Sequence, residues 1–134
     1  MGAMSEGARA GALVLLVDDE RLIRFSLRHY LQKHGFTVLV AEDGAHALQL
    51  ASASAAPIDV LVTDVSLPGI DGFALARRLA RPGLAVVYTS GHQPAQLVES
   101  GRLAPDEVAL CKPFTEAALI DAIARARGRS ESPA

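Results

Sequence analysis

Five short apolar runs, each followed by a longer stretch with helical spacing, constrain the fold of this chain more than any other feature. The runs cover residues 13–17, 36–40, 58–63, 85–89 and 107–111. Most are uniformly apolar instead of alternating, which is typical of strands in a parallel sheet that helices cover on both faces. The pattern therefore predicts an α/β fold with five parallel strands.

The stretches between the runs carry helix signals. Residues 21–34 repeat apolar side chains on one helical face, and Gly35 follows in the place of a left-handed cap. Asp43 and Thr115 are expected to cap helices over residues 44–52 and 116–127, and two shorter helices are expected at residues 72–80 and 93–100. Strict alternation with right-handed crossovers predicts a flavodoxin-like three-layer sandwich with the strand order 2-1-3-4-5.

Length and composition limit the class of protein. A chain of 134 residues, half of them hydrophobic, can bury a single core, and we expect one domain over residues 12–127. Residues 1–11 look like a tag with no fixed structure, and residues 128–134 like a disordered tail. A net charge of −2 gives no general attraction for nucleic acid.

Hydropathy and cysteine content point to a location. The apolar runs are far shorter than the ~20 residues that a membrane span requires. The single Cys111 has no partner for an internal disulfide, which fits a reducing compartment. We therefore expect a soluble, cytoplasmic protein.

Chemically active side chains follow the strand candidates. Asp18 and Asp19 come directly after the first run, and Asp64, Ser90 and Lys112 come after the third, fourth and fifth. Ligands of open parallel sheets bind outside the carboxyl ends of the strands, so these five residues should meet at one site.

Three carboxylates at one site repel one another unless a cation lies among them. A lone Asp-Asp pair after a strand is more often a helix cap, but Asp64 and the turn at residues 64–72 favour a metal site. Mg²⁺ (or Mn²⁺) prefers about six oxygens. We expect direct ligation by Asp19, Asp64 and the backbone carbonyl of Ser66, with Asp18 acting through water.

Four segments, LLVDDE, TDVSLPGIDG, TSG and CKPF, resemble the signature segments of receiver domains of two-component response regulators. The resemblance runs from residue 13 to about residue 127. It implies that Asp64 accepts a phosphoryl group, that Ser90 is the switch hydroxyl and that Lys112 is the invariant lysine. It also implies a cis Lys112–Pro113 bond, slow autodephosphorylation, and a signalling role rather than catalysis on outside substrates.

The resemblance also implies partners. The phosphoryl donor would be a histidine kinase or a histidine phosphotransfer protein, and a downstream protein would bind the face formed by the fourth helix, fifth strand and fifth helix. Ala109 stands where many receivers carry a Tyr or Phe that reports phosphorylation, so either the coupling runs through the loop before the fourth helix or it is weak. Ser66 and His92 occupy places where family side chains line the path of the attacking water.

Several alternatives stay open at this point. The chain could be a receiver-like interaction module that does not use phosphate. An aspartyl-nucleophile Mg²⁺ phosphohydrolase fits less well, because such enzymes resemble DxDGT where this chain reads DDERL. The segments YTSGH and GRLAPDEVALCKPFT resemble receivers of hybrid sensor kinases, so the C-terminal receiver of a hybrid kinase is the leading interpretation of the context. A stand-alone receiver stays open as the alternative, as does a weak dimer.

Overall fold

The computed structural model describes residues 11–131. The expected tag at residues 1–11 lies, apart from Gly11, outside the described residues, and so do residues 132–134 of the expected tail. The elements are β1 (Leu13–Val17), α2 (Arg21–Lys33), β2 (Thr37–Ala41), α3 (Gly44–Ala53), β3 (Val60–Asp64), α4 (Gly72–Leu79), β4 (Ala85–Ser90), α5 (Pro94–Glu99), β5 (Val108–Cys111) and α6 (Glu116–Glu131).

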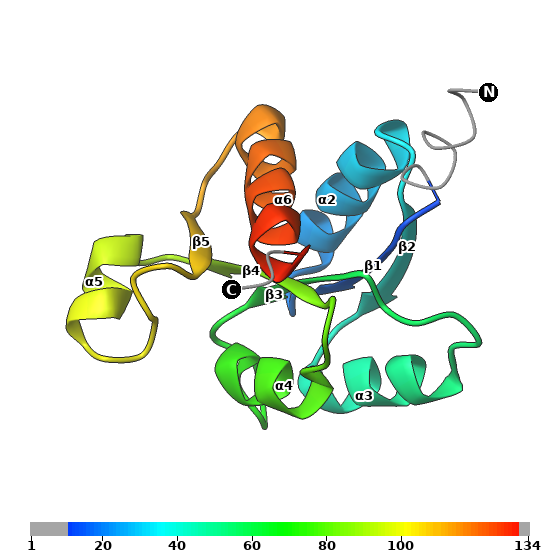
Figure 1. The fold of residues 1–134 in the computed structure, drawn as a ribbon, viewed down its shortest axis with the longest axis horizontal. Coiled ribbons are helices and arrows are strands. Elements are labelled where there is room, and N and C mark those ends of the chain that lie inside the picture. Colours follow the sequence, from blue (N-terminus) through cyan, green and yellow to red (C-terminus); the bar gives the residue numbers. More distant parts are fainter. Residues whose placement is uncertain (1–10, 132–134) are drawn as a thin grey trace.

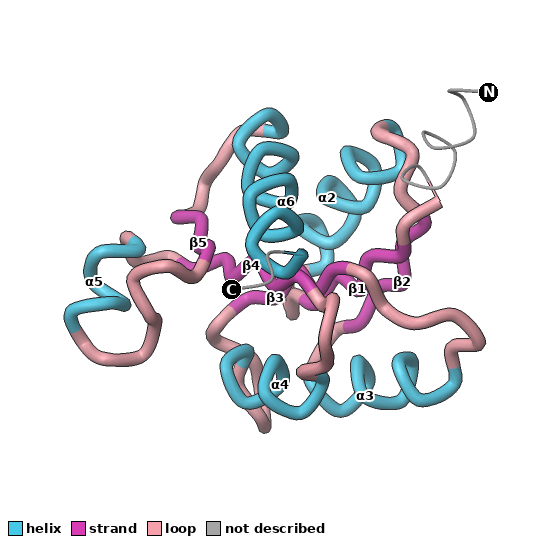
Figure 2. Tube along the Cα trace, viewed as in Figure 1, coloured by secondary structure: helices cyan, strands magenta, loops and turns pink. Residues whose placement is uncertain are grey.

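All five strands are parallel and lie in the order β2-β1-β3-β4-β5, which confirms the predicted topology. Figure 1 shows α2 and α6 together on one face of the sheet and α3 and α4 on the other. The short α5 lies beside the β5 edge, and the tube view shows how the loops around it join this edge to the rest of the sheet (Figure 2). No helix within residues 11–131 has both the length and the apolar character needed to cross a membrane.

The central strand β1 explains why the runs are uniformly apolar. Leu13, Leu15 and Val17 belong to the core on the α3–α4 side, while Val14 and Leu16 belong to the core on the α2–α6 side. Each residue of β1 is buried, because the strand has a helix layer on both faces. A polar residue at any of these positions would be desolvated without a partner.

The last helix is longer than the sequence indicated. We expected it to end near Arg127 and residues 128–134 to be a disordered tail, yet α6 continues to Glu131. Two contacts favour the extra turn. The Arg129 side chain pairs with Asp106 at 2.8 Å, and the Ser130 hydroxyl donates to the carbonyl of Arg127. The sequence signal of Gly128 is too weak to stop a helix that has such contacts.

Gly72 fixes the distance between α4 and the end of β3. A Cβ built at this position would lie 2.1 Å from the carbonyl oxygen of Asp64. The Gly72 N–H donates to the carbonyl of Val65 at 3.0 Å, so the helix begins directly against the strand end. The Asp71 side chain caps the same helix by accepting from the N–H of Ala74.

Gly72→Ala should therefore destabilise the protein by roughly 2–3 kcal/mol, because the helix must move away from Asp64 to admit a methyl group. Gly128→Ala is the matched control. Nothing lies within 4 Å of a Cβ at Gly128, which is inside α6, so this change should stabilise the protein by about 0.5–1 kcal/mol. Urea unfolding of both variants measures the difference. Equal stabilities would mean that the close approach at Gly72 does not constrain the fold.

Candidate functional site

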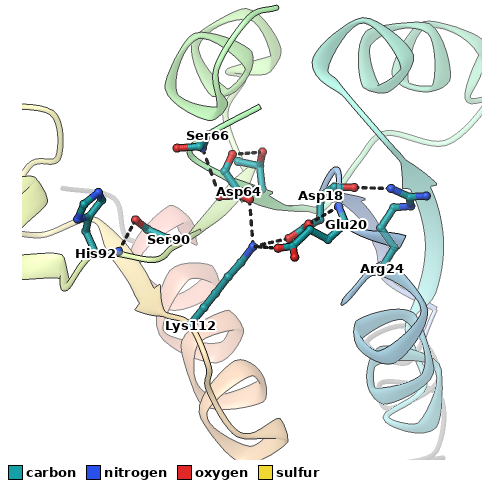
Figure 3. Close-up of polar contacts among 9 residues, drawn as sticks. Asp18, Glu20, Arg24, Asp64, Ser66, Ser90, His92 and Lys112 are labelled. Atoms are coloured by element: carbon teal, nitrogen blue, oxygen red, sulfur yellow. Dashed lines mark hydrogen bonds and ion pairs between the residues drawn. The ribbon is translucent and has the colours of Figure 1, made fainter. Parts of the chain in front are cut away.

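The five predicted site residues lie at one edge of the sheet. Asp64 and Ser90 are the last residues of β3 and β4, Asp18 and Asp19 follow β1, and Lys112 follows β5. The carboxyl ends of parallel strands share one edge, so the fold brings these residues together as expected. Figure 3 shows the side chain of Lys112 reaching from the end of β5 toward Asp18 and Asp64.

The ammonium of Lys112 joins two buried carboxylates. Its Nζ lies 2.8 Å from Oδ2 of Asp18 and 3.0 Å from Oδ2 of Asp64. Oε1 of Glu20 lies 3.6 Å from the same nitrogen. Asp18 is 1% exposed and Asp64 is 7% exposed, so both carboxylates depend on this shared cation for compensation. The peptide bond between Lys112 and Pro113 is cis, as the resemblance to receiver domains implied.

The three aspartates form a compact cluster of oxygens. One carboxylate oxygen from each of Asp18, Asp19 and Asp64 lies within 4.8 Å of the other two. Two oxygens bound at about 2.1 Å to one Mg²⁺ can be at most about 4.2 Å apart, so only a small adjustment separates the cluster from a ligand set. Asp19 is exposed, which leaves a side of the cluster open to water. The donor set therefore fits a hard divalent cation.

Asp64 is held by its own loop. Its Oδ1 accepts the backbone N–H of Ser66 at 3.2 Å, and the hydroxyl of Thr63 donates to its carbonyl at 3.0 Å. Burial raises the pKa of Asp64, the bonds to Lys112 and Ser66 oppose this, and the negative charge of Asp18 adds to the rise. The folded protein thus disfavours a bare carboxylate at this position.

The pKa of Lys112 is raised although the side chain is partly buried. Burial by itself lowers the pKa of this ammonium, but hydrogen bonds and charge interactions with Asp18 and Asp64 outweigh burial and raise it above its ordinary value. Lys112 therefore stays charged at neutral pH.

The hydroxyl of Ser90 is engaged away from Lys112. Ser90 is fully buried, and its Oγ accepts the backbone N–H of His92 at 3.0 Å. In Figure 3 the hydroxyl points toward His92 and not toward the ammonium. The backbone carbonyl of Ser90 accepts the N–H of Lys112 at 2.7 Å, so the two residues are coupled through their main chains.

Two residues at the site were missed in the sequence. Glu20 donates its N–H to Oδ1 of Asp18 at 2.8 Å, and Arg24 donates from Nη1 to the carbonyl of Asp18 at 2.8 Å. Arg24 lies one helical turn beyond Glu20 on the same helix, so its spacing places it within reach of the loop. That spacing was the available signal.

Ala109 of β5 lies opposite Tyr88 of β4 in the sheet register. Tyr88 is buried, and its ring lies 4.8 Å from the ring of Phe73. Burial, with the nearby charge of Glu107, raises the pKa of Tyr88 to about 12. An aromatic ring is therefore present near the end of β4, but it belongs to the strand beside the one that carries Ala109.

Comparison with known proteins identifies the family. The family model of the response regulator receiver domain matches residues 14–124, and the chain therefore belongs to this family. Its members are signalling domains of two-component systems, in which response regulators work with histidine kinases.

The relatives agree with this assignment. The chain is 38% identical over 116 residues to the response regulator MprA of Mycobacterium ulcerans (strain Agy99), which covers 85% of this chain and 48% of that protein. It is 36% identical over 83 residues to the sensor kinase CckA of Brucella abortus (strain 2308), covering 60% of this chain and 9% of that protein. The chain thus spans about half of MprA or less than a tenth of CckA.

A solved structure is similar over nearly its whole length. The crystal structure of a response regulator receiver protein from Sinorhizobium medicae WSM419 aligns with a TM-score of 0.76 at 35% sequence identity. The alignment covers 90% of this chain and 98% of that chain.

The raised pKa of Asp64 predicts a pH-dependent gain in stability for Asp64→Asn. Above the folded pKa, the buried anion costs stability that a neutral amide does not, so the variant should be more stable than the wild type at pH 7.5 in EDTA. As the pH falls through the folded pKa and then below 3.8, the ordinary value, the carboxyl becomes protonated in both the folded and the unfolded state, and the difference should vanish. Urea unfolding across this range measures the effect. A variant that is no more stable at pH 7.5 would contradict the stated balance of burial and pairing.

Proposed function

We propose that this domain accepts a phosphoryl group on Asp64 from the phosphohistidine of a histidine kinase or histidine phosphotransfer protein, with Mg²⁺ as the required cation. The observation that carries the proposal is the ammonium of Lys112, which lies 2.8 Å from Asp18 and 3.0 Å from Asp64 beside the open carboxylate of Asp19. A phosphoryl acceptor site needs a carboxylate nucleophile close to positive charge. Lys112 supplies one positive charge here, and a bound divalent cation would supply the rest.

The chemistry is a simple displacement at phosphorus. A carboxylate oxygen of Asp64 forms a bond to phosphorus while the bond between phosphorus and the donor's imidazole nitrogen breaks, and its electron pair returns to that nitrogen. The product is an acyl phosphate. Attack by water then regenerates the carboxylate and releases inorganic phosphate. The domain is thus a signalling module that catalyses its own phosphorylation and dephosphorylation.

Each phosphoryl oxygen finds a partner at this site. Lys112 would bind one oxygen, and the hydroxyl of Ser90 with a backbone N–H would bind a second. Mg²⁺ would neutralise charge on the third, held by Asp19, Asp64 and the carbonyl of Ser66, with Asp18 contacting it through water. Most of the catalysis in such a site comes from positioning and charge neutralisation.

A groove beside Lys112 offers a place for the phosphoryl donor. Residues of α2 and of the loop after β5 line it, among them Leu22, Pro113 and Phe114. Leu22 is 80% exposed, an unusual state for a large apolar side chain unless a partner covers it. The position of the groove, with Lys112 in its wall, would bring a donor histidine next to Asp64.

Ser90 is the proposed switch. A phosphoryl group on Asp64 would draw the Ser90 hydroxyl away from the N–H of His92, and this exchange would bias the loop that leads into α5. The output surface would be the face of α5, β5 and α6. Because Ala109 cannot act as a rotating aromatic, the signal would pass through the His92 loop.

A module that binds partners without phosphate is the second candidate. Ala109 favours it, because the usual aromatic reporter is missing from β5. The intact acids and Lys112 favour the phosphoacceptor. We take the expected unit of residues 12–127, extended by the last turn of α6 to Glu131, as the receiver unit, with a hybrid kinase or a stand-alone regulator as its context.

Phosphorylation can be tested by intact mass. After incubation with Mg²⁺ and a small acyl or amide phosphate, the wild type should gain one phosphoryl unit, and EDTA should prevent the gain. Asp64→Asn should gain nothing, whereas Asp121→Asn, which changes an exposed carboxylate on α6, should behave as the wild type. No gain with a small donor or with a cognate kinase would favour the module that does not use phosphate.

Lys112→Ala should slow the phosphorylation of Asp64 by roughly 100-fold, because one phosphoryl oxygen loses its cation. Any label that forms should fail to produce the conformational response. Lys33 is the only other lysine in the chain and pairs with Glu116 at the surface, so Lys33→Ala is the matched control. Rates by quenched-flow labelling measure the comparison. Unchanged labelling in the Lys112 variant would remove that residue from the mechanism.

A further inference from the structure

The guanidinium of Arg24 holds one particular peptide of the site. Nη1 of Arg24 donates to the carbonyl oxygen of Asp18 at 2.8 Å, and Figure 3 shows this bond on the side of Asp18 away from Lys112. That carbonyl belongs to the peptide group that joins Asp18 to Asp19. Because a peptide group is planar, holding its oxygen also fixes the direction in which the Cα of Asp19 leaves it.

Asp18 has several other attachments. Its N–H donates to the carbonyl of Ala41 at 3.3 Å, its Oδ1 accepts from Glu20 and its Oδ2 accepts from Lys112. Arg24 is therefore not needed to keep the buried Asp18 side chain in place.

Asp19 has no such support. Its side chain is exposed, and within residues 11–131 no hydrogen bond or ion pair reaches its carboxylate. The position of this carboxylate then depends on the backbone that carries it. Arg24 supplies the side-chain hydrogen bond to the peptide on its N-terminal side.

The charge of Arg24 has no acidic partner. No ion pair of the described part of the chain includes Arg24, although its side chain is half-buried and reaches the backbone of Asp18. A charged donor to a backbone carbonyl contributes more than a neutral one, so the bond to Asp18 is the main polar contact of this side chain.

From these contacts we infer that Arg24 is a positioning residue for Asp19 in the divalent-cation site. The inference rests on the proposed function, since it presumes that Asp19 is a metal ligand. Arg24 acts through the peptide between Asp18 and Asp19 and touches neither the cation nor the phosphoryl group. It holds the backbone of Asp19 from the N-terminal side, while the bond from the Glu20 N–H to Oδ1 of Asp18 holds the peptide on the C-terminal side.

The positioning role and the charge of Arg24 predict opposite changes in the affinity for Mg²⁺. A positive charge near a cation site repels the cation, so removal of an arginine should strengthen Mg²⁺ binding if charge alone mattered. Loss of positioning has the opposite effect, because Asp19 must then be ordered when the metal binds. The direction of the change in affinity therefore separates the two roles.

The test is calorimetric titration of the folded domain with Mg²⁺ alone. Arg24→Ala should weaken Mg²⁺ binding about tenfold, the effect typical of losing a contact that orients a ligand. Arg24→Lys should recover part of the affinity, because an ammonium can donate one hydrogen bond to the same carbonyl. Arg21→Ala removes an equal charge from an exposed position on the same helix and should leave the affinity unchanged or slightly tighter.

A double-mutant cycle with Asp19→Asn completes the experiment. In the Asp19→Asn background, Arg24→Ala should no longer change the affinity for Mg²⁺, because the ligand that it positions is gone. A general structural role would instead weaken binding equally in both backgrounds, with a matching loss of stability in urea. Equal weakening in both backgrounds, wild-type affinity in Arg24→Ala, or equal weakening by Arg21→Ala would each overturn the inference. Absence of Mg²⁺ binding by the wild type would instead refute the proposed function itself, and the inference with it.

Discussion

One ammonium shared by two buried carboxylates governs this structure. Lys112 lies within 3.0 Å of both Asp18 and Asp64, and those carboxylates are almost completely removed from water. Buried charges are tolerated only when they are paired, and here a cluster of three aspartates has one lysine beside it, which pairs with Asp18 and Asp64. The formal excess of two negative charges is the charge that a divalent cation neutralises. Burial raises the pKa of Asp64, with a smaller contribution from the charge of Asp18, and the cluster of oxygens fits a divalent cation.

The parallel topology of the sheet keeps the carboxylates and the ammonium together. The parallel order β2-β1-β3-β4-β5 brings the ends of β1, β3 and β5 to one edge, so charges far apart in sequence meet there. Gly72 lets α4 begin directly against the carbonyl of Asp64, and Arg24 and Glu20 hold the loop after β1. The hydroxyl of Ser90 lies at the same edge and accepts the N–H of His92, so the site and the loop that leads into α5 meet at this hydrogen bond.

Much of this could be predicted from the sequence. The strand β1 was predicted to the residue, because uniform burial on both faces requires a run such as Leu13–Val17. The meeting of Asp18, Asp64 and Lys112 followed from their positions after strands. The predicted end of α6 was wrong. The last turn is favoured by the ion pair between Arg129 and Asp106, which are far apart in sequence, so a local pattern does not reveal it. The role of Gly72 also escaped prediction, since it depends on a distance between elements that no local pattern encodes. The bond from Arg24 was missed although its helical spacing from the loop after β1 was a usable signal.

The central claim is that a divalent cation binds among Asp18, Asp19 and Asp64. The most direct measurement is a crystal structure of the protein grown with Mn²⁺, with anomalous scattering recorded at the manganese edge. The account predicts one strong peak about 2.1–2.2 Å from oxygens of Asp19 and Asp64, with Lys112 still beside Asp64. A fully occupied peak elsewhere, or none at this edge of the sheet at saturating Mn²⁺, would contradict it.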